Sequence, residues 1–259
     1  MSDAFDLAGV RRRKIAKLVE ERGSVGVKDL SEEFGVSDVT IRRDLKELGQ
    51  LGVVTRTHGG VMINSAIMGD LPNEERKIVA HAEKARIGKV AIEMLSGTEV
   101  VYLDAGTTAL SVAENAHLKP ECRYVTTSLG VASLLMEQDI KNFFLIGGAY
   151  RDTNDSFTGT LAIAALRSLS FDVSFLCCSA VDIKRRSIAI NDEVYSLVQK
   201  EAIASSRRNI VVAHNEKISS NGFVHTAGFD QLACIITDSG LNEESRTRLM
   251  DTNIEVVLA

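Results

Sequence analysis

The sequence contains little proline, few cysteines and no tryptophan. Its two prolines, Pro72 and Pro120, argue against a proline-rich linker or a long disordered segment. The four cysteines form no CxxC pair, and neither they nor the histidines show the spacing of metal ligands. We therefore expect reduced, buried thiols, and we predict neither a metal site nor a cofactor.

Long apolar runs are also missing. No stretch approaches the roughly 18 residues that a bilayer-spanning helix needs, and the N-terminus has no apolar core followed by a small-residue cleavage site. We expect a cytoplasmic protein with no membrane partner. The length of 259 residues suits one large domain or two unequal ones.

The net charge of −5 is unevenly distributed along the chain. Residues 1–60 contain 11 of the 30 Lys and Arg residues and 10 of the 35 Asp and Glu residues, so they carry +1 while the rest carries −6. Attraction to phosphates is local, because salt screens it beyond about 10 Å. Any binding to nucleic acid must therefore depend on where the N-terminal cations lie.

The first 60 residues have the pattern of three helices and a hairpin. Helices are expected over 11–22, 28–34 and 38–48, because their apolar residues recur three and four positions apart. Gly35 is suited to end the second helix, and Ser37 is suited to cap the third. Residues 51–60 alternate and then reach a Gly-Gly pair, which favours a β-hairpin. Two helices joined by a short turn that contains glycine are typical of a helix-turn-helix.

The third predicted helix has a polar outer face. Three apolar residues point inward, namely Ile41, Leu45 and Leu48. The N-terminal half of the outer face is formed by Thr40, Arg42 and Arg43, with Asp38 ahead of them. In a major groove, Arg can pair with guanine and Thr can contact the thymine methyl group. Arg56 on the hairpin and the basic run 11–14 are placed to contact phosphates. The alternative is an ordinary solvated basic surface.

Two segments of this region resemble a known family. Residues 36–45, Val-Ser-Asp-Val-Thr-Ile-Arg-Arg-Asp-Leu, and residues 52–60, Gly-Val-Val-Thr-Arg-Thr-His-Gly-Gly, closely resemble the DeoR family of bacterial sugar-metabolism regulators. The resemblance implies a winged helix-turn-helix whose third helix faces DNA. The DNA-contacting residues that we predict are Ser37, Asp38, Thr40, Arg42, Arg43, Lys46, Arg56 and His58.

A linker is expected after this region. Residues 62–73 are less patterned and contain Gly69 and Pro72, so we place a DNA-binding domain at 1–62, a linker at 63–73 and a second domain at 74–259. A helix over 73–95 should open the second domain. Its expected buried stripe consists of Ile87, Val90, Ala91 and Met94.

Beyond residue 99, short apolar runs alternate with helical stretches. The expected strands are 100–103, 124–126, 143–146, 173–178, 210–212, 234–237 and 254–258. The expected helices among them are 108–115, 131–138, 161–168, 193–205 and 243–250. Such alternation predicts βαβ units, and hence an α/β fold with a mainly parallel sheet.

Three of these strands end in small or hydroxyl-bearing residues. The first ends in Asp104-Ala-Gly-Thr-Thr108, the second in Thr126-Thr-Ser128 and the third in Gly147-Gly148. Ligands of open α/β sheets bind outside the carboxyl ends of strands, where glycine, threonine hydroxyls and helix N–H groups suit a phosphate. Together the loops predict one ligand crevice, although each alone is as typical of an ordinary turn.

The DeoR resemblance extends through these loops. It implies a fold similar to that of ribose-phosphate isomerases and coenzyme A transferases, with sugar phosphates or related intermediates as effectors. The positions that match the family pattern are Asp104, Gly106, Thr107, Thr108, Thr126, Ser128, Gly147, Gly148, Glu193, Lys200 and Lys217. Lys200 or Lys217 could supply the cation that a phosphate needs, and the alternative for each is a solvated surface amine.

The chain departs from the family pattern at three places. Thr127 stands where Asn is usual, His214 stands where Asp is common, and a Gly expected soon after Asp182 is missing. We include Thr127 in the predicted effector site and treat His214 as a candidate hydrogen-bond donor to the effector. Because these positions lie near the presumed ligand, the effector's identity cannot be taken from a relative.

The predicted function is that of a transcriptional regulator, expected to be a repressor, of a carbohydrate-metabolism operon. Its expected partners are operator DNA, a phosphorylated sugar or related metabolite, and further copies of itself in a dimer or tetramer, because helix-turn-helix proteins pair two half-sites. The alternative is a sugar-phosphate isomerase-like enzyme with a DNA-binding appendage, in which Asp104, Glu193 and Lys200 would serve acid–base chemistry. A third interpretation, a ligand-binding module that recruits proteins, would require that DNA binding be absent.

Overall fold

The chain divides into two compact units, Met1–His81 and Ala82–Ala259. The computed structural model describes residues 3–22, 24–50, 54–57, 60–63 and 76–259. The predicted linker therefore lies almost wholly outside the described residues. Val79 and Ala80 are buried against the N-terminal core, so the residues just before His81 belong with the first unit and not with the second, where the sequence pattern had placed them.

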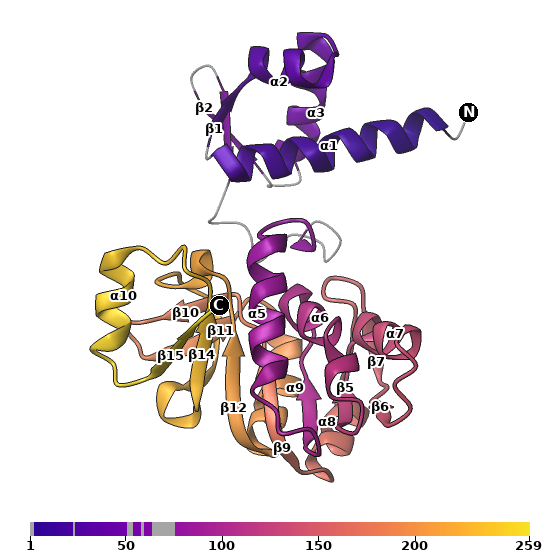
Figure 1. Ribbon diagram of the computed structural model, residues 1–259, viewed down its shortest axis with the longest axis vertical. Coiled ribbons are helices and arrows are strands. Elements are labelled where there is room, and N and C mark those ends of the chain that lie inside the picture. The colour runs from indigo at the N-terminus through magenta and orange to yellow at the C-terminus, as the bar shows by residue number, and fades with distance from the viewer. Residues whose placement is uncertain (1–2, 23, 51–53, 58–59, 64–75) are drawn as a thin grey trace. The chain divides into compact units, whose positions relative to one another are not determined.

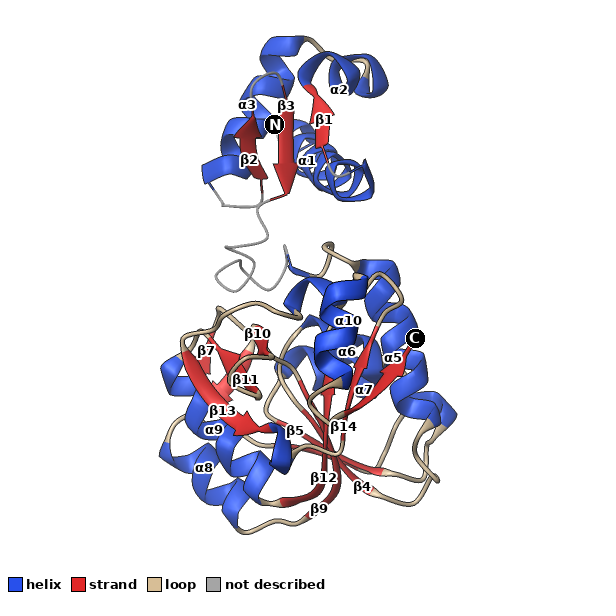
Figure 2. Cartoon of the chain, turned by 90° about the vertical axis from the view of Figure 1, so that its left-hand side faces the viewer, coloured by secondary structure: helices blue, strands red, loops and turns tan. Residues whose placement is uncertain are grey.

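Helices and a small sheet build the N-terminal unit (Figures 1 and 2). The elements are α1 (Asp3–Arg22), β1 (Ser24–Gly26), α2 (Val27–Phe34), α3 (Asp38–Gln50), β2 (Val54–Thr57) and β3 (Gly60–Ile63). The strands pair antiparallel in the order β1-β3-β2, which confirms the hairpin and adds a strand that the sequence pattern did not predict. The core residues Ile15, Leu30 and Ile41 come from one helix each and are fully buried.

The turn between α2 and α3 forms as its sequence predicts. Gly35 adopts φ 61°, a left-handed conformation that costs glycine little, and it ends α2. The Ser37 hydroxyl accepts a hydrogen bond from the Thr40 backbone N–H at 3.3 Å and so caps the start of α3.

The C-terminal unit is built on a seven-stranded parallel sheet. Its strands, in spatial order, are β15 (Glu255–Leu258), β14 (Cys234–Thr237), β12 (Ser206–Val212), β9 (Phe171–Leu176), β4 (Val100–Leu103), β5 (Arg123–Thr126) and β6 (Phe143–Leu145). Each of them coincides with one of the seven predicted strands to within a few residues, and every neighbouring pair is parallel. The α/β prediction is confirmed.

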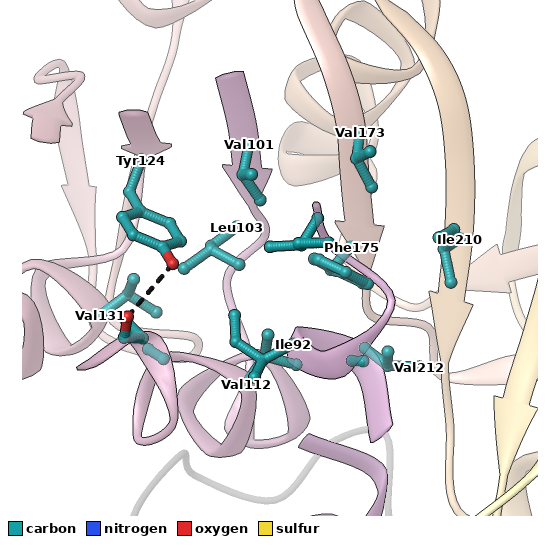
Figure 3. Close-up of a cluster of buried hydrophobic side chains, with 14 of the residues drawn as sticks. Ile92, Val101, Leu103, Val112, Tyr124, Val131, Val173, Phe175, Ile210 and Val212 are labelled. Atoms are coloured by element: carbon teal, nitrogen blue, oxygen red, sulfur yellow. Dashed lines mark hydrogen bonds between the residues drawn. The ribbon is translucent and has the colours of Figure 1, made fainter. Parts of the chain in front are cut away.

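Helices cover both faces of this sheet. The helices are α5 (His81–Glu93), α6 (Thr107–Ala113), α7 (Leu129–Glu137), α8 (Thr160–Arg167), α9 (Glu193–Ala204) and α10 (Glu243–Met250). Val101 and Leu103 of β4 face a core shared with α5, α6 and α7, part of which Figure 3 shows. Tyr102 points to the opposite face, toward α8 and α9. Alternating strand residues thus bury both faces, as is typical of parallel sheets.

Shorter antiparallel pieces lie beside the main sheet and were not predicted. One sheet has the order β10-β11-β13, from β10 (Ala180–Asp182), β11 (Ser187–Ile190) and β13 (Val224–Gly228). The other pairs β7 (Ala149–Arg151) with β8 (Ser156–Thr158). Within the described residues, every helix is too short or too polar to cross a lipid bilayer.

The direction in which strands are added reverses between β4 and β9. From β4 the chain adds β5 and β6 on one side, whereas β9 is followed by β12, β14 and β15 on the other. In open α/β sheets, the crevice at such a reversal, outside the carboxyl ends of the strands, is where ligands bind. Asp104 follows β4 and Cys177 follows β9 at this point.

Helix α5 approaches α6 very closely. A Cβ added at Gly88 would lie 2.1 Å from the carbonyl oxygen of Ser111, so only glycine fits there. Both helices start at the carboxyl edge of the sheet, because α5 leads into β4 and α6 leaves it. Helix α5 begins at His81, later than the predicted start at residue 73. Residues 73–75 lie outside the described residues.

Candidate DNA interface and effector site

The outer face of α3 carries an exposed stripe. The stripe consists of Val39, Arg42, Arg43 and Lys46, whose spacing of three, one and three residues puts them on the same side of the helix. Val39 is 76% exposed, and the Arg43 side chain is 82% exposed. The buried residues Ile41, Leu45 and Leu48 lie on the opposite side, as predicted. An apolar side chain and three cations therefore project from one face of a short helix.

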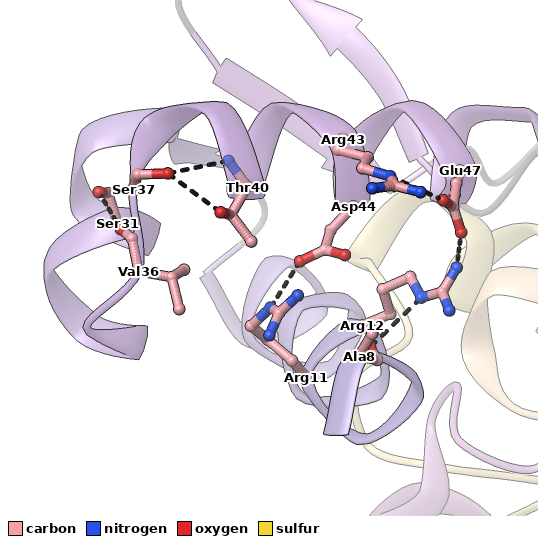
Figure 4. A network of polar contacts seen from close by, with 10 residues as sticks. All are labelled: Ala8, Arg11, Arg12, Ser31, Val36, Ser37, Thr40, Arg43, Asp44 and Glu47. Atoms are coloured by element: carbon pink, nitrogen blue, oxygen red, sulfur yellow. Dashed lines mark hydrogen bonds and ion pairs between the residues drawn. The ribbon is translucent and has the colours of Figure 1, made fainter. Parts of the chain in front are cut away.

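The polar residues at the start of α3 stabilise the first turn of the helix (Figure 4). Thr40 is only half-exposed, and its hydroxyl lies 3.0 Å from that of Ser37, which also caps the helix. Asp38 is half-buried in the first helical turn, where a negative charge is favourable. Thr40 thus lies at the edge of the exposed stripe, and Val39 occupies the outward position that the sequence analysis did not assign.

Ion pairs join α1 to α3. Arg11 donates to Asp44 at 2.6 Å, and the Asp44 side chain is 6% exposed. Arg12 pairs with Glu47, whose other oxygen lies 3.7 Å from Arg43 Nε (Figure 4). Arg11 and Arg12, expected from the sequence to contact phosphates, instead hold α3 against α1.

Two predicted DNA-contacting residues belong to the hairpin. Arg56 lies in β2, opposite Val61 of β3 in the register. His58 lies outside the described residues. The contacts of both residues with DNA therefore stay predictions.

Asp104 lies at the centre of the carboxyl edge of the sheet. It is fully buried, and its carboxylate accepts hydrogen bonds from the Tyr195 hydroxyl, from Gln199 Nε2 at 2.7 Å and from the Cys177 backbone N–H at 2.9 Å. Burial raises the pKa of Asp104 to about 6, although these hydrogen bonds act in the opposite direction. The carboxylate thus links β4, β9 and α9.

The rest of the first loop opens helix α6. Gly106 adopts φ 139°, and a Cβ there would lie 3.0 Å from the Cys177 sulfur, so glycine is required on both counts. Thr107 and Thr108 are buried in the first turn of the helix.

The hydroxyl groups of the second loop form hydrogen bonds within the protein. The Thr126 hydroxyl accepts from the Ser128 backbone N–H, and the Ser128 hydroxyl caps α7 by accepting from Val131 N–H. The Thr127 hydroxyl lies 3.2 Å from that of Tyr102. All three loop residues are buried, and these hydrogen bonds fix the conformation of the loop.

In the third loop, Gly147 and Gly148 are both exposed. A Cβ at Gly148 would lie 2.3 Å from the Thr158 carbonyl oxygen, so the backbone of this loop lies against β8. Packing against β8 therefore explains why position 148 is a glycine, whether or not a ligand binds there.

The residues of α9 that contact Asp104 are not the two that the sequence predicts for the effector site. Glu193 and Lys200 are exposed, and their seven-residue spacing puts them on one face of the helix. Tyr195 and Gln199 occupy a different, buried face and reach the carboxylate. Gln199 Oε1 is buried and has no hydrogen-bond partner among the described residues.

A second polar cluster follows β12 and faces α5. His214 is 2% exposed and Lys84 is 3% exposed, and the charges of Lys84 and Lys217 both act on the His214 ring. Burial, and then the charges of Lys84 and Lys217, hold the pKa of His214 well below its usual value. Lys84 was not predicted, although it shares the i, i+3, i+4 and i+7 spacing of the buried stripe that continues through Ile87. The structure thus brings His214 and Lys217 together with a cation that the sequence analysis missed.

Comparison with known families covers both units. Residues 11–66 match the model of the DeoR-like helix-turn-helix domain, and residues 79–239 match that of the DeoR C-terminal sensor domain. Among solved structures, ribose 5-phosphate isomerase A from Methanocaldococcus jannaschii is 14% identical with a TM-score of 0.40, over 53% of this chain and 54% of that one.

Curated relatives align over nearly the whole chain. The transcriptional repressor AccR of Agrobacterium fabrum is 34% identical over 91% of this chain and 92% of its own. The putative aga operon transcriptional repressor of Escherichia coli O157:H7 is 30% identical over 96% and 93%. The lactose phosphotransferase system repressor of Staphylococcus aureus is 30% identical over 95% and 98%. These relatives are regulators, so the alternative of an isomerase-like enzyme is set aside. The chain belongs to the DeoR family of transcriptional regulators.

Proposed function

We propose that this regulator represses a carbohydrate-metabolism operon and that a phosphorylated sugar or related metabolite, bound at the carboxyl edge of the C-terminal sheet, controls its affinity for operator DNA. The names of two relatives, repressors of the aga operon and of the lactose phosphotransferase system, support the carbohydrate connection. The observation that carries the proposal is the exposed stripe on α3, which holds Arg42, Arg43 and Lys46.

The stripe suits a major groove. Arg42 and Arg43 lie in the N-terminal half of α3, and it is the N-terminal residues of a recognition helix that contact base edges. Arginine pairs bidentately with guanine, while the neighbouring lysine at position 46 suits a phosphate. Asp44 and Glu47 are engaged by α1 arginines, which keeps these carboxylates away from the DNA phosphates.

The carboxyl edge of the sheet suits a small anion. Lys84 and Lys217 supply two cations near the buried ring of His214. Gln199 adds a buried carbonyl oxygen that can accept a hydrogen bond from a sugar hydroxyl. A phosphate dianion would be attracted by the cations, and the polar groups around it would orient the sugar.

Control requires that the effector prefer one conformation of the protein over the other. We propose a dimer or tetramer that places two copies of α3 on operator half-sites one helical turn apart. In that arrangement, an effector that changes the spacing of the copies changes affinity without touching DNA.

The test is a gel shift on the promoter next to the protein's own gene, with a panel of sugar phosphates added. We expect one of them to change the mobility shift of wild-type protein. Thr107→Asp, which adds a negative charge, and Lys84→Met, which removes a cation, should bind the promoter normally and no longer respond. Thr247→Asp adds the same charge on exposed α10 and serves as the control. A normal response in both site variants would overturn the proposed effector site.

A further inference from the structure

His214 is buried without a hydrogen-bond partner. It is 2% exposed, and neither Nδ1 nor Nε2 has a partner among the described residues. The nearest carboxylate, that of Glu216, lies 3.9 Å from Nε2, beyond hydrogen-bonding distance. A buried polar group left in this state is unfavourable, and a ligand that completes the hydrogen bond would relieve that cost.

Charged groups approach this ring from each element packed around it. Lys84 comes from α5, and Glu216 and Lys217 come from the turn after β12. Asp238, at the end of β14, accepts hydrogen bonds from the backbone and side chain of Asn215. Burial is the largest cause that keeps the imidazole neutral, and the charges of the two lysines act in the same direction.

We propose that His214 couples effector binding to proton uptake: an anion that binds beside Lys84 and Lys217 draws a proton from solvent onto the imidazole, which then donates a hydrogen bond to it. This inference rests on the proposed effector site and narrows its ligand to compounds with a doubly charged group such as a phosphate monoester. No bond is made or broken except that to the proton.

The coupling has a simple electrostatic cause. A dianion offsets the charges of both ammonium groups, so the potential that opposed protonation of the ring is removed. A neutral imidazole donates from one nitrogen only, whereas an imidazolium donates from both. Linkage is reciprocal, so protonation of His214 tightens anion binding once the pH falls below the bound-state pKa. The gain is about tenfold for each further pH unit, until the pKa of the free protein is reached.

Sulfate is the probe that tests this coupling. It remains a dianion at every pH used, so any pH dependence of its binding belongs to the protein. The full chain, with nitrogen-15 in its histidine rings and threonine amides, is titrated with sulfate at constant ionic strength. The ring nitrogen shifts report whether His214 is neutral or protonated, and the Thr107 amide reports binding. His214→Asn assigns the ring signal.

We expect sulfate to shift the Thr107 amide and to convert His214 from neutral to protonated at the acid end of a pH range from 5.5 to 7.5. The dissociation constant for sulfate should rise about tenfold from pH 5.5 to 7.5 in the wild type and less than about threefold in His214→Asn. The exposed histidine variant His117→Asn should behave like wild type.

Two results would overturn the inference in distinguishable ways. If the Thr107 amide shifts and His214 stays neutral, the anion site stands and the proton coupling is wrong. If neither signal changes at any sulfate concentration, the proposed effector site is wrong as well. Should His214→Asn be unstable, the ring shifts of the wild type decide the matter alone, and His214→Gln supplies the assignment.

Discussion

The two units of this protein display their cations in opposite ways. On α3, Arg42, Arg43 and Lys46 are exposed, whereas in the C-terminal unit Lys84 is almost completely buried, near the neutral ring of His214. Exposed charges keep their hydration and interact weakly, by about 1 kcal/mol at contact distance in water, and salt screens them further. They suit a long polyanion, on which many weak contacts add up.

Burial has the opposite consequence. A cation removed from water interacts more strongly with an anion nearby, because the surroundings screen the charges less. It therefore suits one small ligand of defined charge that fits one place. The two buried carboxylates differ in another way, because Asp44 faces an arginine from α1 while Asp104 is held by neutral donors.

The largest effect should come from breaking the close contact of α6 with α5, the helix that carries Lys84. Gly88→Leu places a side chain 2.1 Å from the Ser111 carbonyl and must push α5 away from α6. We expect the free energy of unfolding of the C-terminal unit to fall by about 3 kcal/mol. Urea unfolding followed by circular dichroism measures it. Gly9→Ala on α1, where nothing lies within 4 Å, is the matched control and should be neutral or slightly stabilising.

Much of the architecture was predictable for a specific reason. The seven strands of the parallel sheet are short apolar runs buried on both faces, and such runs are visible in the sequence whatever they pair with. β10, β11 and β13 are three to five residues long, and β11 pairs with a strand some 35 residues further along. A pairing so distant leaves no local periodicity, so these strands were missed.

The sites were predicted less completely than the fold. The strand-end loops identified Asp104 and Thr107, because glycine and hydroxyl residues after a strand are a local signal. The partners Tyr195 and Gln199 come from a helix some 90 residues away, and only packing brings them to Asp104. Lys84 was hidden because a lysine in a helical pattern is ordinarily assigned to the solvent side.

On the exposed side, Arg43 should matter through the shape of its side chain as well as its charge. Arg43→Ala should weaken operator binding by about 2 kcal/mol, roughly thirtyfold. Arg43→Lys keeps the charge and loses the bidentate fork, so it should lose almost as much on the operator while retaining binding to unrelated DNA. Fluorescence anisotropy measures both. Equal affinity of Arg43→Lys and wild type for the operator would reduce Arg43 to a phosphate contact.

In the buried site, Asp104 should make the stability of the protein depend on pH. The pKa of Asp104 in the folded protein, about 6, exceeds its value in the unfolded chain, so the folded state binds the proton more tightly. The associated stability is present below about pH 4 and is lost as pH rises through 6. Asp104→Asn lacks this contribution. The difference in unfolding free energy between wild type and variant should therefore grow by between about 1 and 2 kcal/mol from pH 7 to pH 4.5. A difference that shrinks on acidification would contradict the raised pKa.

The smallest expected effect concerns Val39, the apolar member of the exposed stripe. A side chain that is 76% exposed in the free protein has apolar surface left to bury on DNA, and the thymine methyl group is the apolar feature of the major groove. Replacing thymines one at a time by uracil, in an operator selected in vitro with this protein, removes single methyl groups. One such replacement should weaken wild-type binding by about 0.8 kcal/mol, the value of one buried methylene.

The same replacement should cost Val39→Ala much less, because the contact it removes is already lost. A double-mutant cycle isolates that coupling from any general effect of uracil on DNA shape. Lys46→Ala is the comparison, since a phosphate contact from this position should show no coupling to any thymine methyl group. If no position in the operator couples to residue 39, Val39 borders the groove without reading it, and sequence discrimination by α3 would fall to Arg42 and Arg43 alone.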